Sequence, residues 1–246
     1  MLACVSCQWH LSNSGNDDGD GKVAIERYDR LERHFLTSLD IAALQQMKTE
    51  YPVQTRMLIE NVLQLGRVDE PDITTRFLSF FQDSTLQVLM ADVEAQYSDV
   101  SDLEDQLTTA FGRLSEMSPS LHLPSVYTQI GSLDQSIVVG EGMLGISLDK
   151  YLGTDYPVYL RYGYTDRQRA MMTREYIVPD CIGFFLLSVY PIGETESSDG
   201  HIARIQYVVN RVMGRKIFTD ANVKAVEQAM ARKPAATIDE ILGSRE

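Results

Sequence analysis

The sequence contains no apolar run near the roughly 18 uncharged residues that a membrane-spanning helix needs. Positive charge is also scarce, because 22 Lys and Arg residues stand against 35 Asp and Glu residues and leave a formal net charge of −13. Nucleic-acid binding and electrostatic attachment to an anionic membrane both need a basic face. The charge therefore argues against a nucleic-acid partner and against an anionic membrane surface as an electrostatic partner.

Cysteine and histidine are too few for the common metal sites. The 3 cysteines are Cys4, Cys7 and Cys181, so there is no second cysteine pair for a four-thiolate zinc site. The 4 histidines are scattered and form no HExxH motif. The chain also lacks GxSxG, P-loop and GxGxxG motifs. We therefore predict no metal and no cofactor.

The first 22 residues have the character of a tether. A cysteine after Val-Ser or Leu-Ala, followed by a small, polar and acidic tract, is typical of the end of a bacterial lipoprotein signal peptide. This interpretation favours Cys7 as the lipid-bearing residue, with Cys4 as the alternative. A disordered start with incidental cysteines is the competing interpretation.

Residues 23–118 are predicted to form a helical half. Apolar residues between Ile25 and Phe35 recur at three- and four-residue spacing, which favours a helix over a strand. Ser101 and Glu104 have the spacing of a capping box. The helix that they open is predicted to bury an inner face of Leu103, Leu107, Ala110, Phe111 and Leu114. Further helices are expected over residues 40–48, 52–65, 73–81, 84–97 and 101–116.

Residues 119–192 are predicted to hold a small sheet and a central helix. Segments 125–130, 136–139 and 143–148 are predicted as strands, and Gly-Glu-Gly at 140–142 as a hairpin turn. A Tyr- and Gly-rich crossing follows at 151–164, then a long helix from Thr165 to about Tyr190. C-terminal helices are expected within 199–233. The sequence thus predicts a predominantly helical α+β fold, with one domain over 23–246 and a partly antiparallel sheet packed on helices.

Two acids of the predicted central helix are the candidates for chemistry. Glu175 and Asp180 have apolar neighbours, so we expect partly desolvated carboxylates that need a partner. The candidate partners are Arg161, Arg169 and Arg174. One hypothesis is a general base in a cleft. The favoured one is a structural ion pair or helix cap, because no nucleophile or metal ligand accompanies the acids.

A family resemblance rests on two neighbouring segments. They read LGISLDKYLGTDYPVY at 144–159 and MMTREYIVPD at 171–180. Weaker segments agree in order: YDRLERHF at 28–35, KTEYP at 48–52 and PSVYTQIGS at 124–132. Over roughly residues 23–190 the chain resembles the GldB family, gliding-motility lipoproteins of Bacteroidota.

The resemblance implies a lipid-anchored protein at the outer membrane that faces the periplasm or the cell surface. It implies a role in gliding motility and linked secretion, with an envelope protein as partner, and a fold similar to zincin metallopeptidases. If Glu175 takes the catalytic position of a zincin, the ligand positions fall on Arg174 and Val178, which do not bind zinc. We therefore expect no zinc and no proteolysis.

The pocket of such a fold is expected to survive as a binding cleft. Its predicted lining is Tyr151, Asp155, Tyr156, Arg174 and Glu175. Two alternatives remain. One is a degenerate hydrolase that uses Glu175 or Asp180, and the other is a carrier of a small ligand or peptide in the Tyr-rich crossing.

Overall fold

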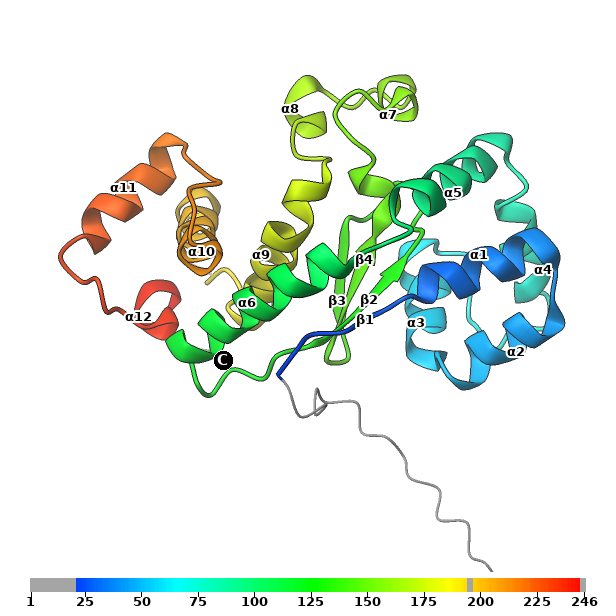
Figure 1. Ribbon diagram of the computed structural model, residues 1–246, viewed down its shortest axis with the longest axis horizontal. Coiled ribbons are helices and arrows are strands. Elements are labelled where there is room, and N and C mark those ends of the chain that lie inside the picture. The colour runs from blue at the N-terminus through cyan, green and yellow to red at the C-terminus, as the bar shows by residue number, and fades with distance from the viewer. Residues whose placement is uncertain (1–20, 194–196, 244–246) are drawn as a thin grey trace, which may run out of the picture.

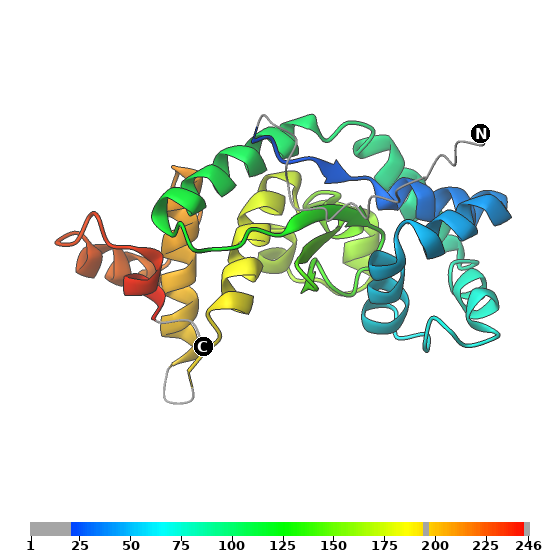
Figure 2. The ribbon, with the colours of Figure 1, turned by 90° about the horizontal axis from the view of Figure 1, so that it is seen from below.

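The structure is a computed structural model that describes residues 21–193 and 197–243. A four-stranded mixed sheet lies at its centre, with the N-terminal helices on one side and a later helix, α9, on the other (Figures 1 and 2). The predicted lipidation sites Cys4 and Cys7, and most of the predicted tether, lie outside the described residues.

The sheet has the strand order β1-β2-β4-β3. Strands β1 (Ile25–Glu26), β2 (Ser125–Gln129) and β4 (Met143–Ser147) run parallel, and β3 (Ile137–Gly140) pairs antiparallel with β4. Glu141 and Gly142 join β3 to β4 with φ angles of 52° and 75°, as a two-residue type I′ turn requires. The predicted small, partly antiparallel sheet and its hairpin are therefore confirmed.

The first strand is a departure from the predicted helical half. Ile25 pairs with Val126 of β2, so the helix expected across this region begins only at Tyr28. The free side of β1 is held by α6, because the Ile25 N–H donates to Glu104 Oε1 at 3.0 Å. Ser101 makes no side-chain cap. The predicted capping box is wrong, since the Glu104 carboxylate supports the strand instead.

The helices before the sheet otherwise follow the predicted pattern. The inner face predicted for α6 is buried, with Leu103 and Phe111 at 1% and 2% exposure. Gln64, with φ of 52°, lies at the end of the predicted 52–65 helix, whose second half is π-helical. The elements are α1 (Tyr28–Ser38), α2 (Ile41–Thr49), α3 (Pro52–Arg56), the π-helical η1 (Met57–Val62), α4 (Ile73–Phe80), α5 (Ser84–Gln96) and α6 (Ser101–Met117).

The long helix predicted from Thr165 is wrong. A capping box between Thr165 and Gln168 starts a single turn, and a new helix begins at Ile177. Pro179 fixes that start, because a proline lacks the N–H that only the first turn can spare. The elements are η2 (Leu148–Tyr151), α7 (Pro157–Arg161), α8 (Asp166–Arg169), η3 (Arg174–Tyr176) and α9 (Ile177–Val189).

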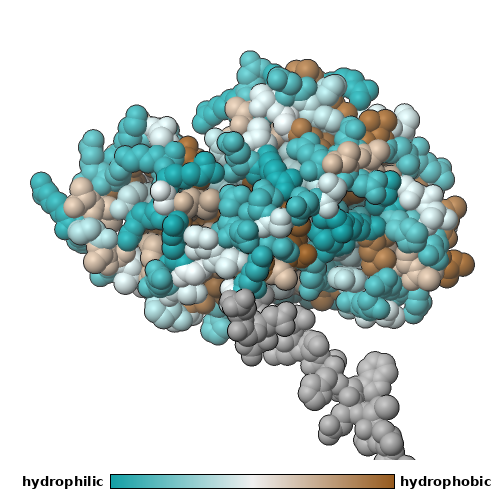
Figure 3. Space-filling model, in the orientation of Figure 1, coloured by the Kyte–Doolittle hydropathy of each residue, from teal (hydrophilic) through white to brown (hydrophobic). Residues whose placement is uncertain are grey.

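Three helices complete the chain: α10 (Ser198–Met213), α11 (Ala221–Met230) and α12 (Ile238–Leu242). The buried apolar residues of α12 and most of those of α10 belong to the same core as those of the sheet and α6, whereas Val223, the buried residue of α11, lies outside it. On the face shown in Figure 3, polar residues cover most of the surface and hydrophobic residues form separate small patches. Within the ranges that the structure describes, no helix is long and apolar enough to cross a membrane.

Candidate functional site

Buried polar side chains gather where the parallel strands end. This is the edge at which open parallel sheets usually bind ligands. None of these side chains is more than 3% exposed. We call them the carboxyl-edge cluster: Asp29 and Glu32 of α1, Thr128 and Gln129 of β2, Ser147 of β4, and Asp149 of η2.

Asp149 holds the loop that follows β2. One carboxylate oxygen accepts the N–H of Gly131 at 2.7 Å, and the other accepts that of Leu133 at 2.5 Å. The loop needs this support, because Ser132 and Leu133 have φ angles of 53° and 67°. That left-handed conformation costs a residue other than glycine about 1 kcal/mol or more. Burial raises the pKa of Asp149, and the two N–H bonds offset part of the rise.

Glu32 is the second fully buried carboxyl group of the cluster. Its Oε2 accepts the Ile130 N–H at 2.9 Å, whereas Oε1 has no hydrogen-bond partner in the described part of the chain. Burial raises the pKa of Glu32 well above its ordinary value, and the charges of Asp149 and Asp29 add to the rise. The fold therefore favours the protonated form of this side chain.

We expect the variant Glu32→Gln to be less sensitive to pH than the wild type. A carboxyl group whose pKa is raised in the fold stabilises below its unfolded pKa of about 4.3, and this contribution is lost as the pH rises toward the folded pKa. Denaturant titrations at several pH values between about 4 and 7 should show the wild type losing stability relative to the variant. The variant Glu116→Gln, at an exposed site, serves as control. Parallel curves of unfolding free energy against pH for the wild type and Glu32→Gln would contradict the prediction.

Tyr151 and Asp180 form the inner pair among the predicted site residues. The buried Tyr151 hydroxyl donates to Asp180 Oδ2 at 2.8 Å, and the Tyr151 carbonyl accepts from the Tyr97 hydroxyl at 2.5 Å. Burial raises the pKa of Asp180 to about 7, and the Tyr151 hydrogen bond offsets part of that rise. Asp180 is therefore the desolvated acid that the sequence predicted, and its partner is a tyrosine instead of an arginine.

Arg174 and Glu175 lie elsewhere. The Arg174 guanidinium stacks on the Tyr97 ring at 4.9 Å and donates to the Asp99 carbonyl at 2.8 Å and to Asp102 at 3.0 Å. Glu175 is exposed in the η3 turn before α9. The expectation that Glu175 is desolvated on a helix is thus wrong, because the helix begins after it and its side chain points to solvent.

The other predicted cleft residues, Tyr156 and Asp155, belong to the crossing. The Tyr156 hydroxyl donates to Asp92 of α5 at 2.8 Å, which fastens the crossing to that helix. The Asp155 side chain is 99% exposed and lies 3.9 Å from Arg169. The structure thus separates the five predicted cleft residues and Asp180 into an inner pair, two surface anchors and two exposed acids.

The crossing itself combines a fixed interior with an exposed apolar surface. Tyr159 is fully buried, and its hydroxyl donates to the Asp149 carbonyl at 2.6 Å and accepts the Leu152 N–H at 2.9 Å. In contrast, Leu160 and Tyr162 of the crossing are 53% and 58% exposed, and Met171, which follows α8, is 40% exposed. The helices α7 and α8 that carry or adjoin them project from the body at the top of Figure 1. We call these three residues the crossing surface.

A comparison with known protein families assigns this chain to a family. A family model described as "Gliding motility protein GldB" matches residues 15–201, well over half of the chain. The chain belongs to the GldB family. No curated protein and no solved structure matches the chain. The family is one of lipoproteins associated with gliding motility.

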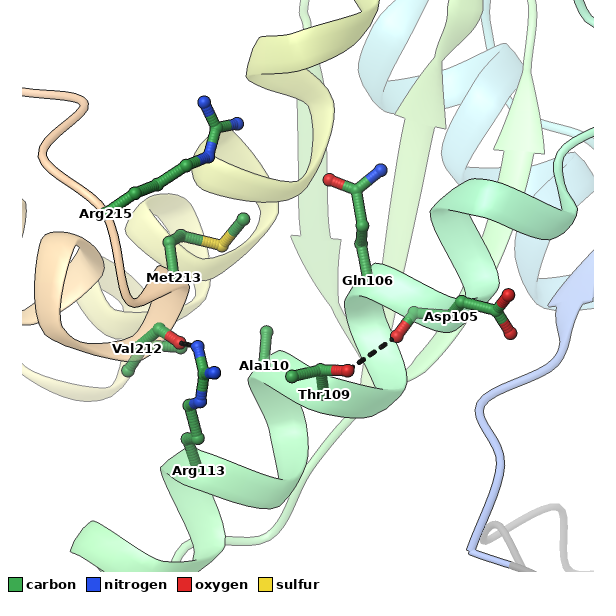
Figure 4. Close-up of a pocket in the computed structure, with 8 residues that line it drawn as sticks. All are labelled: Asp105, Gln106, Thr109, Ala110, Arg113, Val212, Met213 and Arg215. Atoms are coloured by element: carbon green, nitrogen blue, oxygen red, sulfur yellow. Dashed lines mark hydrogen bonds between the residues drawn. The ribbon is translucent and has the colours of Figure 1, made fainter.

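The GldB match covers the sheet, the carboxyl-edge cluster and the crossing, and it ends early in α10. The rest of α10 and the two last helices form a C-terminal part beyond the match. A pocket of about 340 Å³ lies between this part and α6, and its lining includes Ala110 and Met213 (Figure 4). There Arg113 donates to the Val212 carbonyl at 2.7 Å. Its guanidinium thereby caps α10 and joins the C-terminal part to the GldB body.

Arg174 and Val178, the two residues that the expected likeness to zincins would place at zinc-ligand positions, make other contacts in the structure. Arg174 is bound to α6, as described above, and Val178 is buried at 1% exposure. Among residues 21–193 and 197–243, no group of three or more His, Cys, Asp or Glu side chains is placed to hold a metal ion.

Proposed function

We propose that this chain is a lipid-anchored, non-catalytic protein of the bacterial cell envelope that binds another envelope protein in gliding motility and linked secretion. The family match supports the association with motility and the lipoprotein character. We further propose that the lipid is carried by Cys7, or alternatively by Cys4. It would hold the protein at the outer membrane, where the body faces the periplasm or the cell surface.

A binding role is supported by what the candidate acids contact. Asp180 is engaged by the Tyr151 hydroxyl inside the fold, and Glu175 points to solvent. The Tyr151 hydroxyl that donates to Asp180 is on a side chain only 1% exposed, whereas acid–base catalysis needs a reacting group from the substrate within hydrogen-bond reach of the acid. Asp180 thus contributes to the interior of the fold, and Glu175 is a solvated surface residue.

The observation that carries the proposal is the crossing surface. Leu160, Tyr162 and Met171 expose large side chains on a segment whose Tyr159 is locked inside the fold. Exposed aromatic and aliphatic groups on a rigid support are typical of protein interfaces. A fixed segment loses little conformational entropy on binding, so the contact area contributes more of its free energy to affinity.

The charge beside this surface indicates the partner's chemistry. Arg161 lies between Leu160 and Tyr162 and is exposed, in a chain whose net charge is −13. No carboxylate within the described ranges forms an ion pair with Arg161. We therefore propose that the partner presents an apolar groove with an acidic rim.

Photo-crosslinking in the native envelope tests this surface. A crosslinking amino acid at position 162 is expected to capture one envelope protein, because Tyr162 lies at the proposed interface. The same amino acid at the exposed Gln228 of α11, or at the exposed Ile41 of α2, is expected to capture none of that protein. The same set of products at all three positions would count against the crossing surface.

Mass spectrometry of the protein purified from its own membrane tests the anchor. The mature N-terminus is expected to be a diacylated or triacylated Cys7, with Cys4 as the alternative residue. The substitution Cys7→Ser should then release the protein from the membrane fraction. An unmodified N-terminus far from both cysteines would overturn the anchor while leaving the crosslinking result intact.

A further inference from the structure

A second pocket, of about 340 Å³, lies between α1 and α5 against the carboxyl end of β2. Three arginines, Arg27, Arg30 and Arg33, line it. The buried residues Val93 of α5 and Ile130 also border it, each only 1% exposed. We call it the arginine pocket. It lies on different elements from the crossing surface and was not anticipated from the sequence.

The charges of the arginine pocket do not cancel. Arg27 Nε and Nη2 donate to the two Asp29 oxygens at 2.9 and 2.8 Å, and Asp29 is thereby neutralised. Arg33 pairs with Glu94 at 2.8 and 2.6 Å. Arg30 donates to the Ser98 carbonyl at 2.6 Å, and no carboxylate in the described part of the chain forms an ion pair with it. One positive charge is therefore in excess, within a chain of net charge −13.

The pocket also holds an unused hydrogen-bond donor. Arg33 Nε is buried and has no acceptor within the ranges that the structure describes. A buried donor without a partner costs about 1–3 kcal/mol. An acceptor recovers that cost only if the Arg33 side chain turns on binding, because the nitrogen is not accessible from the pocket in the structure.

We propose that the arginine pocket binds a carboxylate monoanion. A planar guanidinium matches a carboxylate in geometry, and one excess charge matches a monoanion. A phosphate dianion fits less well, because Asp29 and Glu94 lie in the same lining. The carboxylate belongs either to a free small acid or to the C-terminal residue of a polypeptide.

Calorimetric titration of the full chain with butyrate tests the proposal. We expect saturable binding at one site, and Arg30→Gln is expected to weaken it about tenfold because the unpaired charge is lost. Arg30 is exposed, so this variant should fold, and a circular dichroism melt checks that it does. Arg30→Lys keeps the charge without the planar guanidinium, so its affinity for butyrate is expected to lie between those of the wild type and Arg30→Gln. The exposed-site control Arg232→Gln should bind as the wild type does.

Several outcomes would overturn the proposal: no saturable binding of butyrate, equal affinity in Arg30→Gln, or equal binding of butanol. Tighter binding of inorganic phosphate would overturn the choice of a carboxylate. Two peptides with an apolar last residue, one with a free and one with an amidated C-terminus, distinguish the sources. Preference for the free peptide over butyrate supports a chain end, and binding of butyrate alone supports a free acid. None of these results depends on the crossing surface.

Discussion

Asp149→Ala is expected to lower the free energy of unfolding by about 3–5 kcal/mol. The substitution leaves two buried N–H groups, those of Gly131 and Leu133, without an acceptor, and each such loss costs about 1–3 kcal/mol. It also removes the side chain that holds Ser132 and Leu133 in the left-handed region. Chemical denaturation monitored by circular dichroism measures the loss.

The loop offers a matched control for Asp149. Asp134 lies in the same loop and is exposed, so Asp134→Ala is expected to change stability by no more than about 0.5 kcal/mol. The loss of stability in Asp149→Asn should lie between those of Asp149→Ala and Asp134→Ala, because the single amide oxygen can replace only one of the two carboxylate oxygens. Equal losses for Asp149→Ala and Asp134→Ala would contradict the role assigned to Asp149.

Gly145→Ala is expected to lower the free energy of unfolding by about 2–3 kcal/mol. A Cβ atom at this position of β4 would lie 2.5 Å from the ring carbon Cζ and the hydroxyl oxygen of Tyr127 on the neighbouring strand. Tyr127 is fully buried and cannot move aside without displacing the helices packed over the sheet. The same denaturation assay measures the cost.

Two further variants test whether the contact with Tyr127, and not the replacement of a glycine as such, causes the expected loss of stability. Gly112 lies in α6 with no atom near its ideal Cβ position, so Gly112→Ala should be neutral or stabilise by up to about 1 kcal/mol. Combining Gly145→Ala with Tyr127→Leu should cost less than the sum of the two single changes, since the smaller side chain makes room for the methyl group. Strict additivity would show that the contact between these residues is not the cause.

Both residues lie in the segment on which the family resemblance rests, 144–159. Gly145 sets the approach of β4 to β2, and Asp149 fixes the loop that follows β2. The same segment provides Tyr151, whose hydroxyl reaches Asp180 of α9. The motif therefore encodes the junction of the sheet, the crossing and the central helix, and it explains why the family could be identified from these residues.

Local patterns were enough to predict much of the fold. The hairpin was predicted because its signals, two glycines at positions 140 and 142 with β-branched residues beside them, lie close together in the sequence. The buried face of α6 was predicted because its apolar residues follow the helical period. Asp180 was predicted as a desolvated acid because its neighbours along the chain are apolar.

Tertiary contacts decided the rest. Nothing near Ile25 in sequence shows that it pairs with Val126, and Glu104 supports that strand because α6 passes beside it. The arginine pocket depends on α5 lying against α1, so its unpaired charge becomes visible only when the distances to Asp29 and Glu94 are known. Periodicity and turn residues act over a few positions of the chain. Pairing of strands and neutralisation of charges depend on groups that only folding brings together.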